Sequence, residues 1–260
     1  MDTQTIRCEV QDYIALVTMD RPPVNAVNAQ FLDDMMLVFD TLSDRDDVRV
    51  AILTGAGRTF CAGADIKERA GREREPGDIW QHSRKAREAF HSLVECKVPV
   101  IAAINGAAIG WGFELALFAD LRIASDRARF SEMFVKRGLS CDVGGFYRLP
   151  ALVGPEKAAE LLFTGDVIDA AEALRIGLVG RVVAHADLLR EAQALAGRIA
   201  ANPPLAVRAL KAGLRRSCYG DPREIGGWAI DTIRRLAHTD DHREGVASFL
   251  EKRAAVFHGR

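Results

Sequence analysis

The sequence predicts an α/β fold in which parallel strands form the core and a helical region follows. Over the first two thirds of the 260 residues, short apolar runs alternate with longer segments of helical periodicity. The last quarter carries helical patterns alone. Such alternation is typical of parallel sheets, because parallel strands need long crossover connections, usually helices. We therefore expect a core over residues 1–195 and a helical region over 196–260.

The composition is that of an ordinary soluble globular protein, with 48% hydrophobic residues, 27% charged residues and a net charge of -1. The balanced charge argues against a nucleic-acid or membrane partner. We expect no signal peptide, because the first residues carry neither a basic region nor a long apolar stretch, and the most apolar run, 98–112, is interrupted by proline and glycines. Five scattered cysteines without a C-x-x-C pair indicate reduced thiols, so we expect a cytoplasmic protein without a metal site.

The N-terminal third should contain a hairpin, a helix and a buried strand. Residues 4–10 and 13–19 read as paired strands around a polar turn. Asn28 can cap a helix with an apolar face, and 48–54 forms a buried strand. The apolar helix face comprises Phe31, Leu32, Met35, Met36, Phe39 and Leu42.

Further along, helices and strands continue to alternate. The polar stretch 71–78 reads as a surface loop, followed by a helix over 79–96 and a buried strand over 99–104. Prolines start two C-terminal helices, and Thr239 caps the last one. A basic stripe on the first of these helices should be a solvated or intersubunit face; it comprises Arg208, Lys211, Arg215 and Arg216.

Two small-residue turns are the most informative feature. The first is Cys-Ala-Gly-Ala-Asp at 61–65, and the second, rich in glycine and alanine, covers 104–114. Each follows a strand-like run and leads into a helical pattern, so each exposes the unpaired N–H groups of a helix N-terminus. Two converging N–H groups would bind a developing oxyanion, such as the enolate of a thioester.

These turns belong to a larger set of motifs. Collinear segments resemble the enoyl-CoA hydratase/isomerase (crotonase) superfamily; they lie at 21–28, 60–67, 99–120, 138–154 and 249–253. The resemblance implies a spiral of ββα units with a helical C-terminal trimerisation region, and hence a homotrimer or a dimer of trimers. It also implies an acyl-CoA thioester as substrate, with CoA as part of that substrate and no separate cofactor.

The resemblance assigns positions for substrate contacts. The two oxyanion-hole amides map to Ala64 and Trp111. The CoA nucleotide should lie near residues of the first two motifs, and Lys252 of a neighbouring subunit should approach its phosphates. The other residues expected near CoA are Asn25, Ala26, Ala62, Asp65 and Ile66.

Glu114 lies in the first turn of an otherwise apolar helix, where a carboxylate is costly unless it has a function. We interpret it as the general acid/base, with a helix-terminal charge role as the alternative. The helix N-terminus should lower its pKa and the apolar surroundings should raise it. The sign of the sum is open at this stage.

For the second carboxylate, the sequence offers two candidates. Hydratases of this superfamily carry a second glutamate at the position of Phe134. Glu132 lies two residues earlier and should point elsewhere, as a solvated or salt-bridged residue. Asp142 matches a position where several superfamily isomerases carry a catalytic aspartate, although it also suits a helix N-cap. Trp111 replaces the usual glycine or alanine, and its indole either narrows the acyl pocket or packs beneath the turn.

We therefore expect an enzyme that adds water to 2-enoyl-CoA through an oxyanion-stabilised enolate, with Glu114 moving protons and Asp142 assisting. The first alternative is an enoyl-CoA double-bond isomerase that uses either carboxylate as a proton shuttle. A minor alternative is a non-catalytic acyl-CoA-binding homologue.

Overall fold

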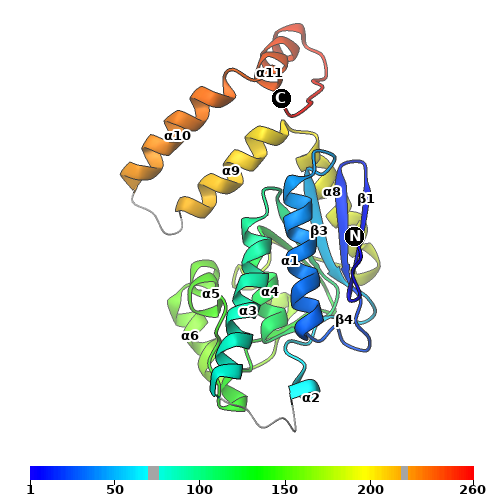
Figure 1. The fold of residues 1–260 in the computed structure, drawn as a ribbon, viewed down its shortest axis with the longest axis vertical. Coiled ribbons are helices and arrows are strands. Elements are labelled where there is room, and N and C mark those ends of the chain that lie inside the picture. The colour runs from blue at the N-terminus through cyan, green and yellow to red at the C-terminus, as the bar shows by residue number, and fades with distance from the viewer. Residues whose placement is uncertain (70–75, 218–221) are drawn as a thin grey trace.

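The larger of two sheets forms the centre of the molecule (Figure 1). The computed structural model describes residues 1–69, 76–217 and 222–260. Strands β1 and β2 form the predicted antiparallel hairpin, and every further pairing in this sheet is parallel. The sheet order is β1(Ile6–Gln11), β2(Ile14–Met19), β3(Val50–Gly55), β5(Val100–Ile104), β7(Leu121–Ser125) and β10(Arg181–Val183).

A smaller sheet lies beside the large one, and its strands follow those of the large sheet in the chain. Thus β3 leads to β4, β5 to β6, and β7 to β8, and each pair is followed by helices. This repetition confirms the strand–strand–helix unit that the family resemblance implies. The order in the small sheet is β4(Thr59–Cys61), β6(Ala107–Ile109), β8(Arg129–Ser131) and β9(Ile168–Asp169).

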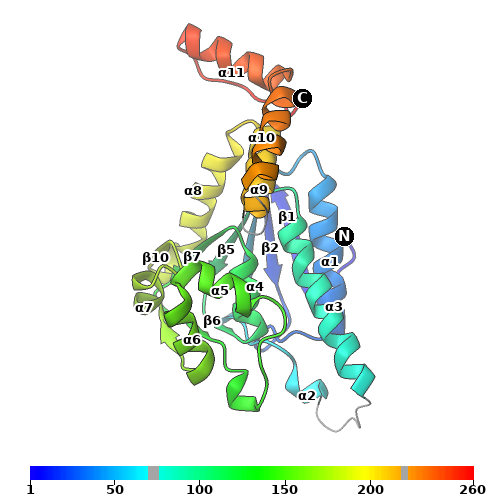
Figure 2. The same ribbon diagram turned by 90° about the vertical axis from the view of Figure 1, so that its left-hand side faces the viewer.

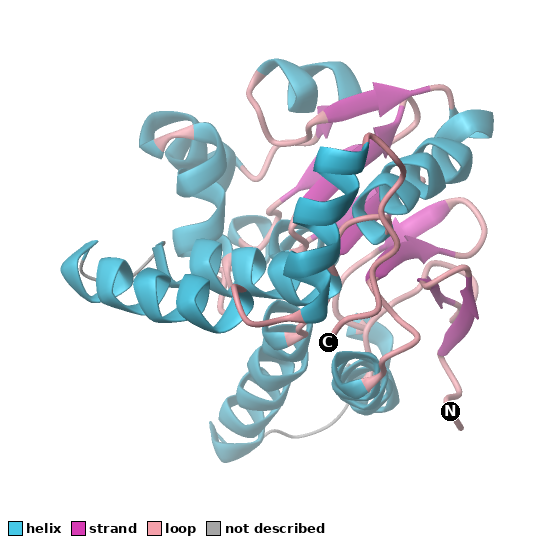
Figure 3. Cartoon of the chain, turned by 90° about the horizontal axis from the view of Figure 1, so that it is seen from above, coloured by secondary structure: helices cyan, strands magenta, loops and turns pink. Residues whose placement is uncertain are grey.

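Helices cover both faces of the large sheet (Figure 3). Strand β3 shows why two faces need cover: Ala51 and Leu53 pack into one apolar cluster, while Val50 and Ile52 pack into another. Because side chains alternate along a strand, both sets can be buried only if helices lie on either side. The first cluster includes residues of α1(Ala29–Asp44), α3(Pro76–Glu95) and α4(Trp111–Phe118), and the second includes α8(Leu188–Ala200).

Local chemistry sets the start of α1, as predicted. The Asn28 side chain accepts a hydrogen bond from the Phe31 amide at 2.9 Å, which satisfies one of the unpaired N–H groups at the helix start. The predicted apolar face is buried apart from Met36, which is partly exposed, and Val38 joins it. The remaining short helices are α2(Ile66–Arg69), α5(Gly145–Val153), α6(Pro155–Thr164) and α7(Ala170–Arg175), with 3-10 turns at Val135–Arg137 and His185–Asp187.

The last three helices form a C-terminal arm that extends away from both sheets (Figures 1 and 2). The arm consists of α9(Pro204–Ser217), α10(Pro222–Leu236) and α11(Asp240–Glu251). The predicted cap of α11 is confirmed, since Thr239 accepts from the His242 amide at 3.1 Å. Helix α8 crosses the expected boundary at 195/196 and packs on the large sheet as far as Ala200.

Two residues of the basic stripe fasten the arm to the core, so the expectation of a wholly solvated or intersubunit face is wrong for them. The buried Lys211 ammonium lies 2.8 Å from the Asp120 carboxylate and donates to the Val98 carbonyl at 2.9 Å. Arg208 donates to the Arg45 carbonyl at 2.9 Å. Both contacts join α9 to the ends of the core helices and strands.

Replacing Lys211 by methionine is expected to lower the free energy of unfolding by about 2 kcal/mol, because Asp120 loses its buried partner. The loss of stability should not be larger, because Asp120 is partly exposed and water can solvate its carboxylate. Urea unfolding followed by circular dichroism measures it. Lys97→Met is the control, since the exposed Lys97–Asp44 pair should contribute little to stability. Equal effects of the two substitutions would contradict the assignment.

Two expectations are only partly covered by the described residues. Of the predicted loop at 71–78, residues 71–75 lie outside the described part, whereas 76–78 already belong to α3. Four of the five cysteines are described, and all four are free thiols. Among the described helices, none combines the length and apolarity that crossing a bilayer requires.

Candidate active site

The two predicted turns pack directly against each other, backbone to backbone. A Cβ atom built on Gly63 would lie 2.5 Å from the Ile109 carbonyl oxygen and 3.3 Å from the Trp111 amide nitrogen. A Cβ atom on Gly112 would lie 2.0 Å from the Cys61 carbonyl oxygen. Glycine is therefore required on both sides of this contact, because any side chain would push the turns apart.

Main-chain geometry explains where the two predicted amides point. Ala64 forms an isolated parallel bridge with Val27, made through the Gly63 carbonyl and the Asp65 amide, each at 2.8 Å. Because N–H directions alternate along an extended chain, the Ala64 N–H points away from Val27. Trp111 is the first residue of α4, directly after Gly110 with its left-handed φ of 53°. Its amide therefore stands at a helix N-terminus, as predicted.

A pocket of about 410 Å³ opens beside these turns. Its lining contains five of the ten predicted site residues. Phe134 also lines it, at the position where hydratases of the superfamily carry glutamate. The lining residues are Ala62, Gly63, Ala64, Ile66, Ser83, Ile109, Gly110, Trp111, Met133, Phe134, Arg137, Leu139, Ser140 and Asp142.

Glu114 is fully buried in the first turn of α4. Its Oε1 atom accepts hydrogen bonds from the amides of Gly144 at 2.9 Å and Gly145 at 2.7 Å. Burial raises the pKa of Glu114 to about 7, against the opposing effect of these amides. The sign that the sequence left open is therefore upward. A carboxyl group that titrates near neutral pH is suited to proton transfer.

Asp142 faces the pocket and does not cap α5, whose N-cap is Gly144. The Trp111 indole Nε1–H donates to its Oδ1 atom at 2.8 Å. This hydrogen bond fixes the direction of the Asp142 carboxylate. Trp111 lines the pocket, and its indole packs edge-on against Phe90, with ring centroids 6.1 Å apart.

The expectation for Glu132 is wrong. Its side chain is buried, with 1% exposure, and neither carboxyl oxygen finds a hydrogen-bond partner among the described residues. Burial raises the pKa of Glu132 well above its usual value, and the charges of Glu114 and Asp142 raise it further. The resemblance places the second glutamate at Phe134, two residues after Glu132, so the sequence pattern does not single out Glu132. Its proximity to α4 arises from strand pairing between distant segments.

The expected CoA-binding segment is held rigidly from within. Asn25, with a left-handed φ of 53°, donates to the carbonyls of Thr59 at 2.8 Å and Ala56 at 3.0 Å, so its side chain is engaged in the fold. Arg21 contacts two further predicted residues: it pairs with the Asp65 carboxylate at 2.8 Å and donates to the Ala26 carbonyl at 3.0 Å. These contacts fix the main chain of the segment within the fold.

Lys252 does not reach the pocket of its own chain. It caps the C-terminal end of α11 with a left-handed φ of 55° and is exposed. Helix α11 lies at the end of the molecule opposite α2, which carries the pocket residue Ile66 (Figure 1). Only a neighbouring subunit could bring this lysine to the pocket.

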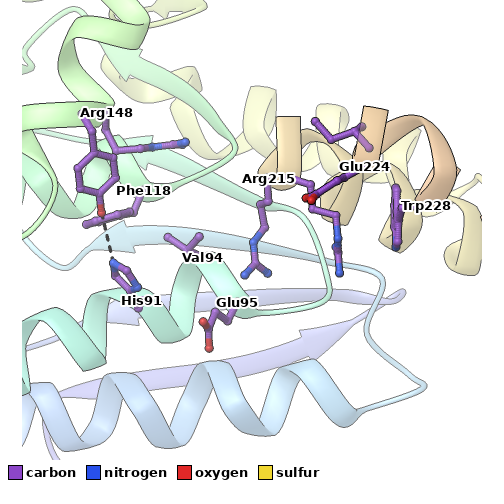
Figure 4. Close-up of a pocket in the computed structure, with 11 residues that line it drawn as sticks. His91, Val94, Glu95, Phe118, Arg148, Arg215, Glu224 and Trp228 are labelled. Carbon is purple, nitrogen blue, oxygen red and sulfur yellow. Dashed lines mark hydrogen bonds between the residues drawn. The ribbon is translucent and has the colours of Figure 1, made fainter. Parts of the chain in front are cut away.

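A second, larger cavity of about 790 Å³ lies between the core and the arm (Figure 4). His91 on α3 and Tyr147 on α5 approach each other in its wall, with their polar atoms 3.2 Å apart. On the opposite side, the Arg216 guanidinium lies 4.6 Å from the ring centroid of Trp228 on α10. None of the predicted catalytic or oxyanion-hole residues lines this cavity, so its volume does not make it the candidate active site.

The fold of repeated ββα units, with two small-residue turns packed together beside a buried carboxylate, defines a crotonase-fold protein. The sequence model of the family described as enoyl-CoA hydratase/isomerase matches residues 9–260. The chain belongs to this family of enzymes.

Two curated relatives and one solved structure illustrate the similarity. A crotonyl-CoA hydratase of Syntrophomonas wolfei is 38% identical, with 99% of each chain covered. A short-chain-enoyl-CoA hydratase of Clostridium acetobutylicum is 36% identical, with 97% of each chain covered. The crystal structure of an enoyl-CoA hydratase from Bacillus anthracis superposes with a TM-score of 0.95 at 33% identity, covering 99% of this chain and 100% of that one.

Proposed function

We propose that the protein hydrates 2-enoyl-CoA thioesters. The observation that supports this proposal is that hydrogen bonds hold two carboxylates in place: Glu114 by the Gly144 and Gly145 amides, and Asp142 by the Trp111 indole. Two positioned carboxyl groups can orient a water molecule and move its protons. Two relatives with names of enoyl-CoA hydratases support the same reaction.

In this mechanism, the amides of Ala64 and Trp111 bind the thioester oxygen as it gains charge. Water adds to the β-carbon, and the resulting enolate is protonated at the α-carbon. One preorganised donor of this kind is typically worth about 3 kcal/mol of transition-state stabilisation. Glu114, as its carboxylate, accepts a proton from the water and then returns it to the α-carbon, while Asp142 orients the water from the pocket wall.

Double-bond isomerisation is the second candidate, and the pocket lining favours it. Asp142 contributes the carboxylate to the described wall, while Phe134 occupies the place of the second glutamate. One carboxylate is enough to remove a proton from one carbon of an enolate-forming substrate and return it to another. The same oxyanion hole serves both reactions.

Absorbance of the conjugated enoyl thioester separates the candidates. Hydration predicts loss of this absorbance with crotonyl-CoA, whereas isomerisation predicts its gain with a 3-enoyl-CoA and no loss with crotonyl-CoA. CoA binding without either change would support a non-catalytic binding protein. The proposal of hydration fails if crotonyl-CoA remains unchanged while the 3-enoyl-CoA is converted.

The pH dependence of hydration should follow Glu114. Its pKa is raised to about 7, so the carboxylate that accepts a proton predominates only above that pH. We expect kcat/KM for crotonyl-CoA to fall about tenfold per pH unit below 7 and to level off above it. A profile that stays flat down to pH 5 would contradict the role of Glu114 as base.

The Trp111 indole should position the second carboxylate. Trp111→Phe keeps the main-chain amide but removes the donor to Asp142, and we expect kcat for hydration to fall about tenfold. Trp228→Phe on the arm is the matched control and should leave kcat unchanged. Steady-state kinetics measures both, and equal kcat values for the two variants would contradict the positioning role.

For CoA, we propose that Ala62, Asp65 and Ile66 border the nucleotide together with the main chain of Asn25 and Ala26. Lys252 from a neighbouring subunit is proposed to approach the phosphates. Its distance from the pocket of its own chain supports a contact between subunits.

We also propose a homotrimer or a dimer of trimers. Large apolar side chains are 47–81% exposed along the arm, which is unusual for a monomer surface and supports burial against other copies. Sedimentation equilibrium should give a mass of three or six chains, and a monomer mass would contradict the proposal. The exposed side chains are Leu210, Leu214, Ile230, Ile233, Val246, Phe249 and Leu250.

A further inference from the structure

Glu132 follows the last residue of strand β8, which ends beside the N-terminus of α4. Ser131 pairs with Ile109, and its carbonyl accepts from the Gly110 amide at 2.8 Å, so β8 ends beside the N-cap of α4. Glu132 is the next residue, and its carbonyl accepts from the Phe134 amide at 2.8 Å. The side chain is thereby enclosed close to the helix turn that carries Glu114.

The surroundings of Glu132 disfavour a second negative charge. The charges that act on it are those of Glu114 on α4 and Asp142 in the loop before α5, and both are negative. Cys141 from the same loop feels the same carboxylates, and burial raises its pKa to about 12, so it remains a neutral thiol. An ionised, unpartnered carboxylate in such a place would be costly, so the neutral acid is the stable form.

Glu114 needs a hydrogen-bond donor at one of its two carboxyl oxygens. Its Oε1 atom is fixed by two amides, but its Oε2 atom is buried without a partner among the described residues. Both oxygens of Glu132 are in the same state. A carboxylic acid carries one O–H donor, and a carboxylate only accepts, so a single proton can satisfy a pair of this kind.

We propose that Glu132 is a positioning residue that stays a neutral acid and donates its O–H to Oε2 of Glu114, so that the pair holds one negative charge. This hydrogen bond holds Glu114 as a carboxylate in a fixed orientation. The shared proton does not depend on which reaction the enzyme performs. Its effect on turnover rests on the proposed role of Glu114.

The first test needs no activity. Difference infrared spectroscopy of the whole protein at pH 8 reports protonated carboxyl groups by their C=O stretch. We expect such a band in the wild type, its loss in Glu132→Gln and its retention in Glu156→Gln, a matched change at an exposed position. Absence of the band in the wild type, or its persistence in Glu132→Gln, would overturn the proposal whatever the enzyme catalyses.

The second test uses the sign of a pH shift. If Glu132 is a neutral donor, Glu132→Gln replaces one donor by another, and the midpoint pH of the acid limb of kcat/KM should stay within about half a unit of the wild-type value. Glu132→Leu removes the donor, so this midpoint should move to higher pH by about one unit or more. If Glu132 were ionised, both changes would remove a negative neighbour and lower the limb. A downward shift in both variants therefore contradicts the proposal.

Folding of the variants can be checked independently. Leucine is similar in volume to glutamate, so Glu132→Leu should leave no cavity, but the buried Glu114 carboxylate loses its donor and we expect the variant to melt cooperatively below the wild type. Kinetics are therefore compared at a temperature below both melting transitions, where a raised acid limb reports on Glu114 and not on unfolding.

Discussion

Replacing Glu114 by glutamine is expected to lower kcat for crotonyl-CoA hydration by about 10³-fold, because the group that exchanges protons with water is lost. Glutamine keeps the shape and can still accept from the Gly144 and Gly145 amides through its carbonyl oxygen. The fold and the affinity for CoA should therefore remain. Steady-state kinetics and calorimetric titration with CoA measure the two effects.

Glu156→Gln is the control for Glu114→Gln, since Glu156 is exposed on α6 and does not line the candidate pocket. It should leave kcat unchanged. Undiminished turnover in Glu114→Gln would end the catalytic role of this residue and leave a buried carboxylate without an explanation.

Replacing Gly63 by alanine is expected to lower kcat by about 10²-fold or more, the typical cost of losing one oxyanion donor. The added methyl group would lie 2.5 Å from the Ile109 carbonyl oxygen and 3.3 Å from the Trp111 amide nitrogen. Both atoms belong to the backbone, which cannot move aside as a flexible side chain could. The two turns must then separate, and the Ala64 and Trp111 amides no longer face one point.

The chain offers a matched control for the backbone itself. Gly57 has a φ of +72° against +85° for Gly63, but a Cβ atom on Gly57 would meet nothing within 4 Å. Gly57→Ala should therefore cost about 1 kcal/mol of stability through its left-handed backbone and leave kcat unchanged. If Gly63→Ala behaves like Gly57→Ala, the close contact between the turns has no catalytic importance.

Local features of the fold could be predicted from the sequence because their causes are local. Asn28 and Thr239 cap helices through amides three residues away. The composition predicts the two glycine-rich turns, since only small residues allow two main chains to approach closely. The collinear family motifs then implied the repeated ββα units, which short-range patterns do not determine.

Burial created by distant segments could not be predicted in this way. Lys211 looks solvated along its helix, yet it is buried against Val98 and Asp120. Glu132 is enclosed only because β8 pairs with β6 beside α4. The hydrogen bond from Trp111 to Asp142 spans 31 positions and likewise depends on the folded chain.

The central claim is that two main-chain amides from separate turns bind one thioester oxygen. A crystal structure of the Glu114→Gln variant with crotonyl-CoA tests it directly, because the substrate should persist in the crystal. We predict that the thioester oxygen lies within about 3.1 Å of both the Ala64 and the Trp111 nitrogen atoms. A thioester oxygen bound to only one of them, or to neither, would contradict the account.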